Sequence, residues 1–76
     1  MLAKLGIAAA SAVILSMANF TYNVPLTGGD NCSNINQDAR CQAAAIANGC
    51  AIDQGAVASV SSCPGTSTTL VCLCTE

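Results

Sequence analysis

Six cysteines, all beyond position 31, constrain this 76-residue chain more than any other feature of its sequence. They are Cys32, Cys41, Cys50, Cys63, Cys72 and Cys74. An even number of cysteines in a short exported chain is typical of a disulfide framework. A zinc site built on Cys72 and Cys74 is the alternative, but zinc sites usually separate paired cysteines by two to four residues. We therefore expect three disulfides, with no metal and no cofactor.

The first 18 residues have the three parts of a secretory signal. Lys4 supplies the positive charge, residues 5–15 are apolar, and Ser16 and Ala18 put small side chains before the expected cleavage site. A retained membrane anchor is the alternative, but an anchor needs about 20 apolar residues. We predict a signal helix that is cleaved after Ala18. The protein is then secreted and extracellular, and it meets a membrane only through this signal.

The residues after the signal offer a small hydrophobic core. More than half of the hydrophobic side chains in 19–76 are Ala or Cys, and large aliphatic side chains are few. Ordering the backbone costs about 1–2 kcal/mol per residue, whereas each disulfide contributes about 2–4 kcal/mol. A single domain held together by its disulfides is the expected outcome.

Residues 19–34 are predicted to form an extended arm, because Pro25 and the Gly28-Gly29 pair break any helix. The arm carries four of the larger apolar side chains, and we take them as candidate contacts with a binding partner. They are Phe20, Tyr22, Val24 and Leu26. The alternative is that these side chains pack against the rest of the domain as core.

Residues 35–76 are predicted to form a helical domain. The Ala-rich segment 35–48 has its apolar residues on one helical face, with Ser33 or Asn34 as N-cap and Gly49 as the stop. A second helix is predicted over 53–62, although 57–61 fits a strand equally well, and 67–74 fits a short strand or a final helical turn. The expected fold is small, disulfide-rich and mainly α: a two-helix hairpin stapled by three disulfides.

These helices restrict the disulfide pairing. Cys41 and Cys50, and likewise Cys50 and Cys63, would be held too far apart along a helix, because bridged Cα atoms lie within about 7 Å of each other. Cys72 and Cys74 are too close in sequence for a favourable ring. Of the fifteen pairings that six cysteines allow, eight remain.

The scarcity of basic residues and the absence of His argue against several functions. Arg40 is the single basic residue after the signal and faces four acidic ones, which disfavours nucleic-acid binding and a cationic membrane-disrupting peptide. The absence of His removes Ser–His–Asp and Cys–His catalysis. Asp38 and Asp53 could form a catalytic carboxylate pair, but a first-turn helix charge and an N-cap explain them more simply. We expect no catalytic residues and no enzymatic activity. The Asn19 and Asn31 sequons leave glycosylation open.

With its signal, six cysteines and low charge, the chain resembles the small secreted cysteine-rich proteins of fungi, a class that includes many effectors. That resemblance implies a protein that binds a host or cell-wall macromolecule without catalysis. A secreted toxin or antimicrobial peptide is the alternative. A protease inhibitor would need a rigid loop across two bridges, for which Pro64–Thr69 is the only candidate.

A second, partial resemblance covers Asn48–Asp53 and Cys72-Leu73-Cys74, which look like the first half of the fungal CFEM domain. That family is a helical extracellular fold with eight cysteines, two more than this chain has. The resemblance implies that Asp53 would ligate haem iron, which makes a small-ligand carrier a further alternative.

Overall fold

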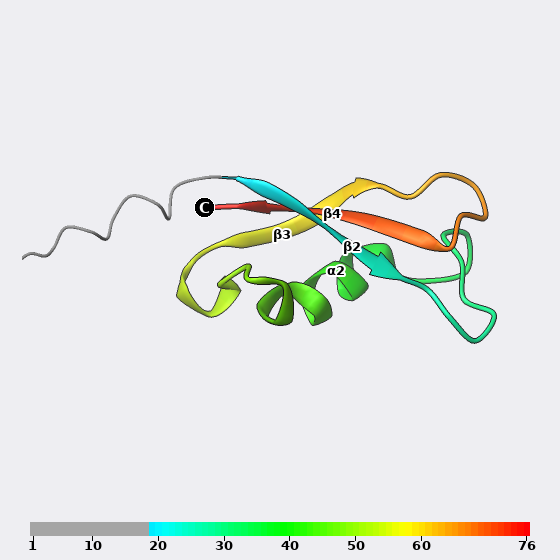
Figure 1. Ribbon diagram of the computed structural model, residues 1–76, viewed down its shortest axis with the longest axis horizontal. Helices are drawn as coiled ribbons and strands as arrows, with labels where there is room; N and C mark the ends of the chain where they lie inside the picture. The colour runs from blue at the N-terminus through cyan, green and yellow to red at the C-terminus, as the bar shows by residue number, and fades with distance from the viewer. Residues whose placement is uncertain (1–18) are drawn as a thin grey trace, which may run out of the picture.

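The structure is a computed structural model that describes residues 19–76, and the predicted signal lies outside this range. Figure 1 shows one helix lying across one face of a three-stranded sheet. The elements follow in the order β2 (Phe20–Pro25), α2 (Gln37–Ala45), the 3-10 turns η2 (Ile46–Asn48) and η3 (Ile52–Gln54), β3 (Val57–Ser62) and β4 (Thr69–Thr75). No helix among the described residues is long and apolar enough to cross a membrane.

Strand β4 is the centre of the sheet. It pairs antiparallel with β2 on one side, from Phe20 opposite Cys74 to Pro25 opposite Thr69, and antiparallel with β3 on the other. Its side chains alternate between the two faces, so that Leu70, Cys72 and Cys74 are buried while Val71 and Leu73 are half-buried on the outer face. The period-2 pattern at the end of the chain thus produces a strand rather than a helical turn.

Helix α2 begins two residues later than its sequence predicts. The expected caps are used elsewhere: the backbone N–H of Ser33 donates to Asn31 Oδ1, and the Asn34 side chain accepts from the Asn31 N–H. Asn36 is the N-cap instead, and its Oδ1 accepts from the Ala39 N–H at 3.1 Å. After Ala45 the helix tightens into η2 and ends at Gly49, whose φ of 87° suits glycine.

The prediction of a mainly α two-helix hairpin is wrong. In the segment expected to form the second helix, residues 52–54 make one 3-10 turn and Val57–Ser62 form strand β3. Gly55 ends the turn with a φ of 103°, and the branched side chains of Val57 and Val60 favour extended backbone. Strand β4 supplies the hydrogen-bonding partner that decides between the two conformations.

The first part of the arm predicted over 19–34 forms the edge strand β2, and the backbone pairing continues beyond it, where the Leu26 N–H donates to the Thr68 carbonyl at 2.8 Å. The chain then passes through turns to α2. In this loop Asp30 forms an ion pair with Arg40 of the helix. Both partners are partly exposed, so the pair contributes little to stability.

Cysteine makes up much of the core between helix and sheet. Cys41, Cys50, Cys72 and Cys74 are fully buried together with Leu70 and Ala45. Disulfides Cys41–Cys72 and Cys50–Cys74 join the helical side of the molecule to β4, and Cys32–Cys63 joins the loop before α2 to the residue after β3. The expectation of three disulfides is confirmed, and the pairing is one of the eight left open by the sequence.

Candidate functional site

The six cysteines occupy structural positions. All are disulfide-bonded, and Cys63 alone among them is half-buried rather than buried. Within residues 19–76 no group of three or more His, Cys, Asp or Glu side chains could hold a metal ion. The cysteines of residues 19–76 therefore cross-link the fold, and none of them is a free thiol.

Two of the four candidate binding residues lie inside the core. Tyr22 and Leu26 are 7% and 6% exposed. They therefore pack as core, which was the alternative to contact with a binding partner. The Tyr22 hydroxyl donates a 2.7 Å hydrogen bond to the Cys41 carbonyl of α2, and burial raises the pKa of this phenol. Phe20 and Val24 are partly buried and pack against the same core.

The remaining candidates lie apart from one another. Asp53 is exposed on η3. Asp38 is exposed in the first turn of α2, where it interacts favourably with the helix dipole. Pro64–Thr69 comprises the end of the loop between β3 and β4 and the first residue of β4. Backbone hydrogen bonds from the N–H groups of Leu26 and Cys32 hold this segment at Thr68 and Ser67. The side chain of the sequon residue Asn31 accepts two local hydrogen bonds, and the Asn19 side chain accepts one from the Glu76 N–H.

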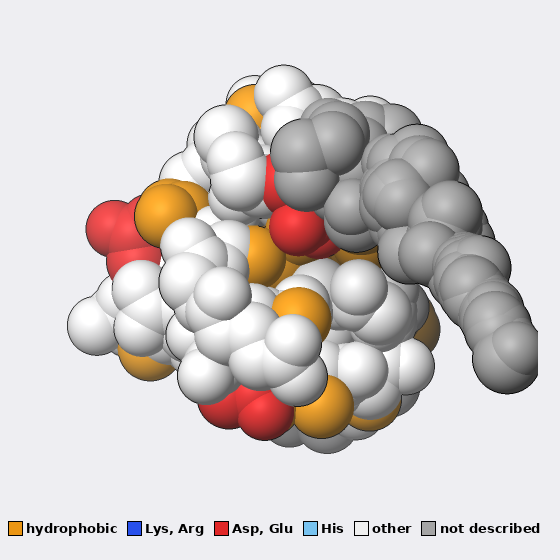
Figure 2. All heavy atoms as spheres, turned by 90° about the vertical axis from the view of Figure 1, so that its left-hand side faces the viewer, with side chains coloured by type: hydrophobic (Ala, Val, Ile, Leu, Met, Phe, Trp, Pro, Cys, Tyr) orange, Lys and Arg blue, Asp and Glu red, His pale blue; other side chains and the backbone are white. Residues whose placement is uncertain are grey.

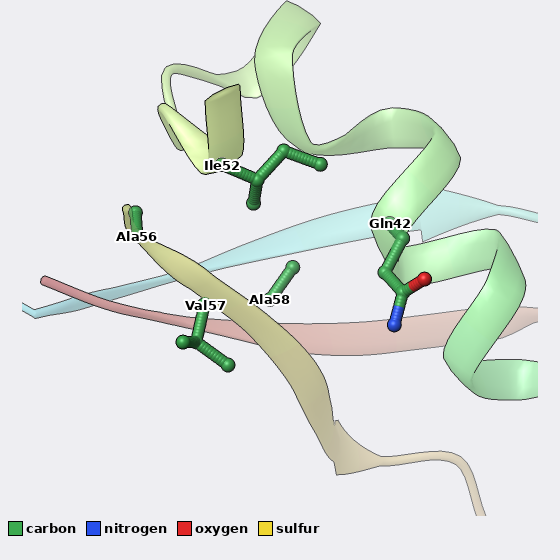
Figure 3. Close-up of a pocket in the computed structure, with 5 residues that line it drawn as sticks. All are labelled: Gln42, Ile52, Ala56, Val57 and Ala58. Carbon is green, nitrogen blue, oxygen red and sulfur yellow. The ribbon is translucent and has the colours of Figure 1, made fainter. Parts of the chain in front are cut away.

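A shallow groove lies between the helical layer and strand β3. Its volume is about 210 Å³, and it is lined by Gln42 of α2, Ile52 of η3, Ala56 and the first two residues of β3, Val57 and Ala58. Figure 3 shows Gln42 and Ile52 extending from the helical side while Ala58 points toward them from the strand. Small-molecule pockets typically have about 300–1,000 Å³, so this groove fits a side chain better than a cofactor.

The buried polar side chains of the described region have no unpaired atom that a ligand would have to satisfy. Every buried side-chain nitrogen and oxygen in residues 19–76 has a hydrogen-bond partner. Binding to this part of the molecule therefore falls to its exposed features, and Ile46 and Val57 are its exposed large hydrophobic side chains, at 59% and 58%.

The outer face of the sheet is a second surface open to contact. The strand registers place Thr21, Ser59 and Leu73 side by side on the face opposite α2, with Asn23 beside Val71. None of these side chains is charged. Figure 1 shows no described element above this face.

The sequence analysis missed the groove because its lining comes from three elements that are separated along the chain. Gln42 lies on an exposed helix face, and Ala58 acquires its orientation only when β3 forms a strand. The alternative strand interpretation of 57–61 was the one sequence signal that could have placed Ala58 beside the helix.

Comparison of the chain with protein-family models, with curated proteins and with solved structures gave no match.

Proposed function

We propose that this chain is a secreted, disulfide-stabilised protein that acts by binding another macromolecule without catalysis, in the manner of a fungal effector. The observation that carries the proposal is that all six cysteines are bonded within one small α/β domain. Such bonds form and persist in oxidising compartments, including the extracellular space. A domain of this size gains from them the stability that its few large apolar side chains cannot supply.

The surface of the domain supports a binding role. One edge of the sheet borders a groove lined by Gln42 and four apolar residues, and the outer face of the sheet is uncharged. The only basic residue of 19–76 is already paired with Asp30. A surface with this charge balance favours uncharged or basic partners, which host proteins and neutral cell-wall polysaccharides can provide.

A depletion experiment tests the proposal. The full chain, produced in a eukaryotic secretory host and recovered oxidised from the medium, is incubated with insoluble chitin, β-glucan and cellulose. It is also passed over immobilised proteins of plant extracellular fluid. We expect at least one material to deplete the oxidised protein from solution, and we expect reduced and alkylated protein to stay in solution.

The toxin alternative gives a different result. Leakage of dye from liposomes, without retention on any of these materials, would replace the binding proposal with direct action on membranes. The expected secretion is tested in the same preparation, since the mass of the secreted chain shows whether residues 1–18 have been removed.

A further inference from the structure

Strand β3 presents a free edge. It pairs with β4 on one side only, and no other backbone hydrogen bond reaches residues 57–62 within the described part of the chain. Natural sheets usually protect such an edge with Lys, Pro or an inward-pointing charge. Residues Val57–Ser62 contain none of these, because the strand consists of Val, Ala and Ser, and a register shift interrupts the edge only between Val60 and Ser62. The backbone groups that face away from β4 are available to another strand.

The groove lies directly beside the beginning of this edge. Val57 and Ala58 belong to β3 and also line the groove, while Ile52 and Gln42 form its opposite wall. Figure 3 shows Val57 pointing away from the helical layer, so that Ala58 is the strand residue facing Ile52 and Gln42. A strand added to β3 would place every second side chain toward this wall, since side chains alternate along a strand. Recognition by strand addition combines these two elements, backbone pairing and a side-chain pocket.

The charges around the groove are acidic. Asp53 follows Ile52 in η3, and Asp38 lies one helical turn before Gln42. Glu76 follows Thr75, the β4 residue paired with Val57. None of these three carboxylates forms a salt bridge within residues 19–76. Figure 2 views the end of the molecule where β3 begins and β4 ends, and it shows acidic and hydrophobic side chains but no Lys or Arg.

We propose that an extended, basic peptide segment of a partner protein binds as a fourth strand along Val57–Val60 and places a small apolar side chain in the groove. This inference rests on the proposed binding function and names its site and the chemistry of its partner. Backbone hydrogen bonds to the free edge provide the affinity. The groove of Gln42, Ile52 and Ala58 selects a side chain of the size of valine, and the neighbouring carboxylates favour Lys or Arg beside it.

A second copy of the chain fits this edge less well. The register of β3 shifts between Val60 and Ser62, so that regular pairing with β4 is confined to Val57–Val60. The bulge bends the edge there and limits any added strand, a peptide or a second copy, to these four residues. Two copies would also bring together surfaces of the same negative sign, whereas a basic peptide gains from that charge.

The test uses the oxidised full chain and a synthetic, acetylated and amidated peptide, Lys-Thr-Val-Thr-Val-Thr-Lys. Amide signals are followed by two-dimensional NMR during titration, and size-exclusion chromatography of the protein alone reports its oligomeric state. We expect the largest shift changes at Val57–Val60 and Ile52 in a monomeric protein. A peptide with N-methyl groups on two consecutive residues should bind at least about tenfold more weakly, because each of its edges loses one N–H donor and carries a methyl group that hinders pairing.

Substitutions separate the groove from the charge. Gln42→Trp fills the groove from an exposed helix position and should raise the dissociation constant of the peptide at least about tenfold. Asp53→Asn should raise it about threefold at low salt, the size expected for one charge several ångströms away in water, and not at all at 1 M salt. Asp30→Asn is the matched control. Asp30 belongs to the loop between β2 and α2, which Figure 1 shows at the end of the molecule opposite the beginning of β3, so this change should leave the constant unchanged.

The outcomes distinguish this inference from the binding function itself. Shift changes confined to the outer face, at Thr21 and Leu73 but not at Val57–Val60 or Ile52, would overturn the edge site while leaving a binding protein. Equal affinity for the N-methylated peptide, or a dimer that pairs through β3, would also overturn it. Depletion of the protein by a cell-wall or host material that is unaffected by Gln42→Trp and Asp53→Asn would place the function elsewhere on the surface.

Discussion

The two edges of the sheet are built differently although both pair with the same central strand. The β2 edge sends Tyr22 into the core, is followed by the buried Leu26, and has Pro25 at its last pair with β4. In β3 only Ala58 and the half-buried Val60 point into the core, and Val57 is 58% exposed. The disulfides and the buried side chains of the β2 edge stabilise this small domain, so the β3 edge can remain unpaired and available for binding.

The largest expected effect comes from removing a disulfide that both edges depend on. The double variant Cys41→Ala/Cys72→Ala opens a link between residues 31 positions apart, which contributes about 3–4 kcal/mol in the chain-entropy model. It also leaves a void in the fully buried core. Urea unfolding followed by circular dichroism measures the loss.

The matched control for this variant is Cys32→Ala/Cys63→Ala. Its disulfide has the same sequence separation of 31, but Cys63 is half-buried. The chain-entropy contribution is therefore equal, and any difference reports the packing of sulfur in the core. We expect the Cys41 and Cys72 pair to cost more by about 1–3 kcal/mol. Equal losses would show that the buried sulfur contributes nothing beyond the cross-link.

The next effect compares one residue from each edge. Tyr22→Ala should reduce the free energy of unfolding by about 3–5 kcal/mol, because it removes a buried aromatic side chain. Val57→Ala should change it by no more than about 0.5 kcal/mol, since Val57 is largely exposed. Thermal and urea unfolding of the two variants measure this contrast. Similar losses would mean that the β3 edge is packed as tightly as the β2 edge.

A smaller effect isolates the hydrogen bond between β2 and the helix. Tyr22→Phe keeps the ring but removes the hydroxyl that donates to the Cys41 carbonyl. The expected loss is about 1 kcal/mol, the usual contribution of an intramolecular hydrogen bond. An unchanged free energy of unfolding would show that the ring alone anchors this edge.

The smallest effect is the pH dependence of the same side chain. Burial raises the Tyr22 pKa above the ordinary value of 10.0. Above pH 10 the unfolded chain therefore loses this proton before the folded chain does, and the stability falls as the pH rises toward the folded pKa. Tyr22 is the only tyrosine, so rapid absorbance titration near 295 nm follows it directly. A midpoint at or below 10 in the folded protein would contradict the assigned burial, and Tyr22→Phe should abolish this part of the pH dependence.

The sequence predicted the parts of the fold that depend on local chemistry. The three disulfides follow from the number and setting of the cysteines, and α2 follows from the Ala-rich segment with Gly49 at its end. It failed where two conformations were nearly balanced. Val57 and Val60 suit the spacing of a helix face as well as extended backbone, and the choice is made by pairing with β4, a contact that no local pattern reveals.

The candidate site was harder to predict for the same reason. Phe20, Tyr22, Val24 and Leu26 alternate as a strand does, but their alternation does not say which face of the sheet α2 will cover. The structure buries Tyr22 and Leu26 in the core, and the Tyr22 hydroxyl donates to α2. The groove joins Gln42, Ile52 and Ala58 from three elements, and only the packed fold brings them together.

Amide hydrogen exchange of the oxidised full chain, without any ligand, tests most directly whether the β3 edge is free. Amides in the middle of β4 have strands on both sides and should exchange slowly throughout. Alternate amides of Val57–Val60 should exchange far faster, because they point away from β4 into solvent. Slow exchange at all four residues, comparable to that of β4, would show that this edge is covered and would contradict the account.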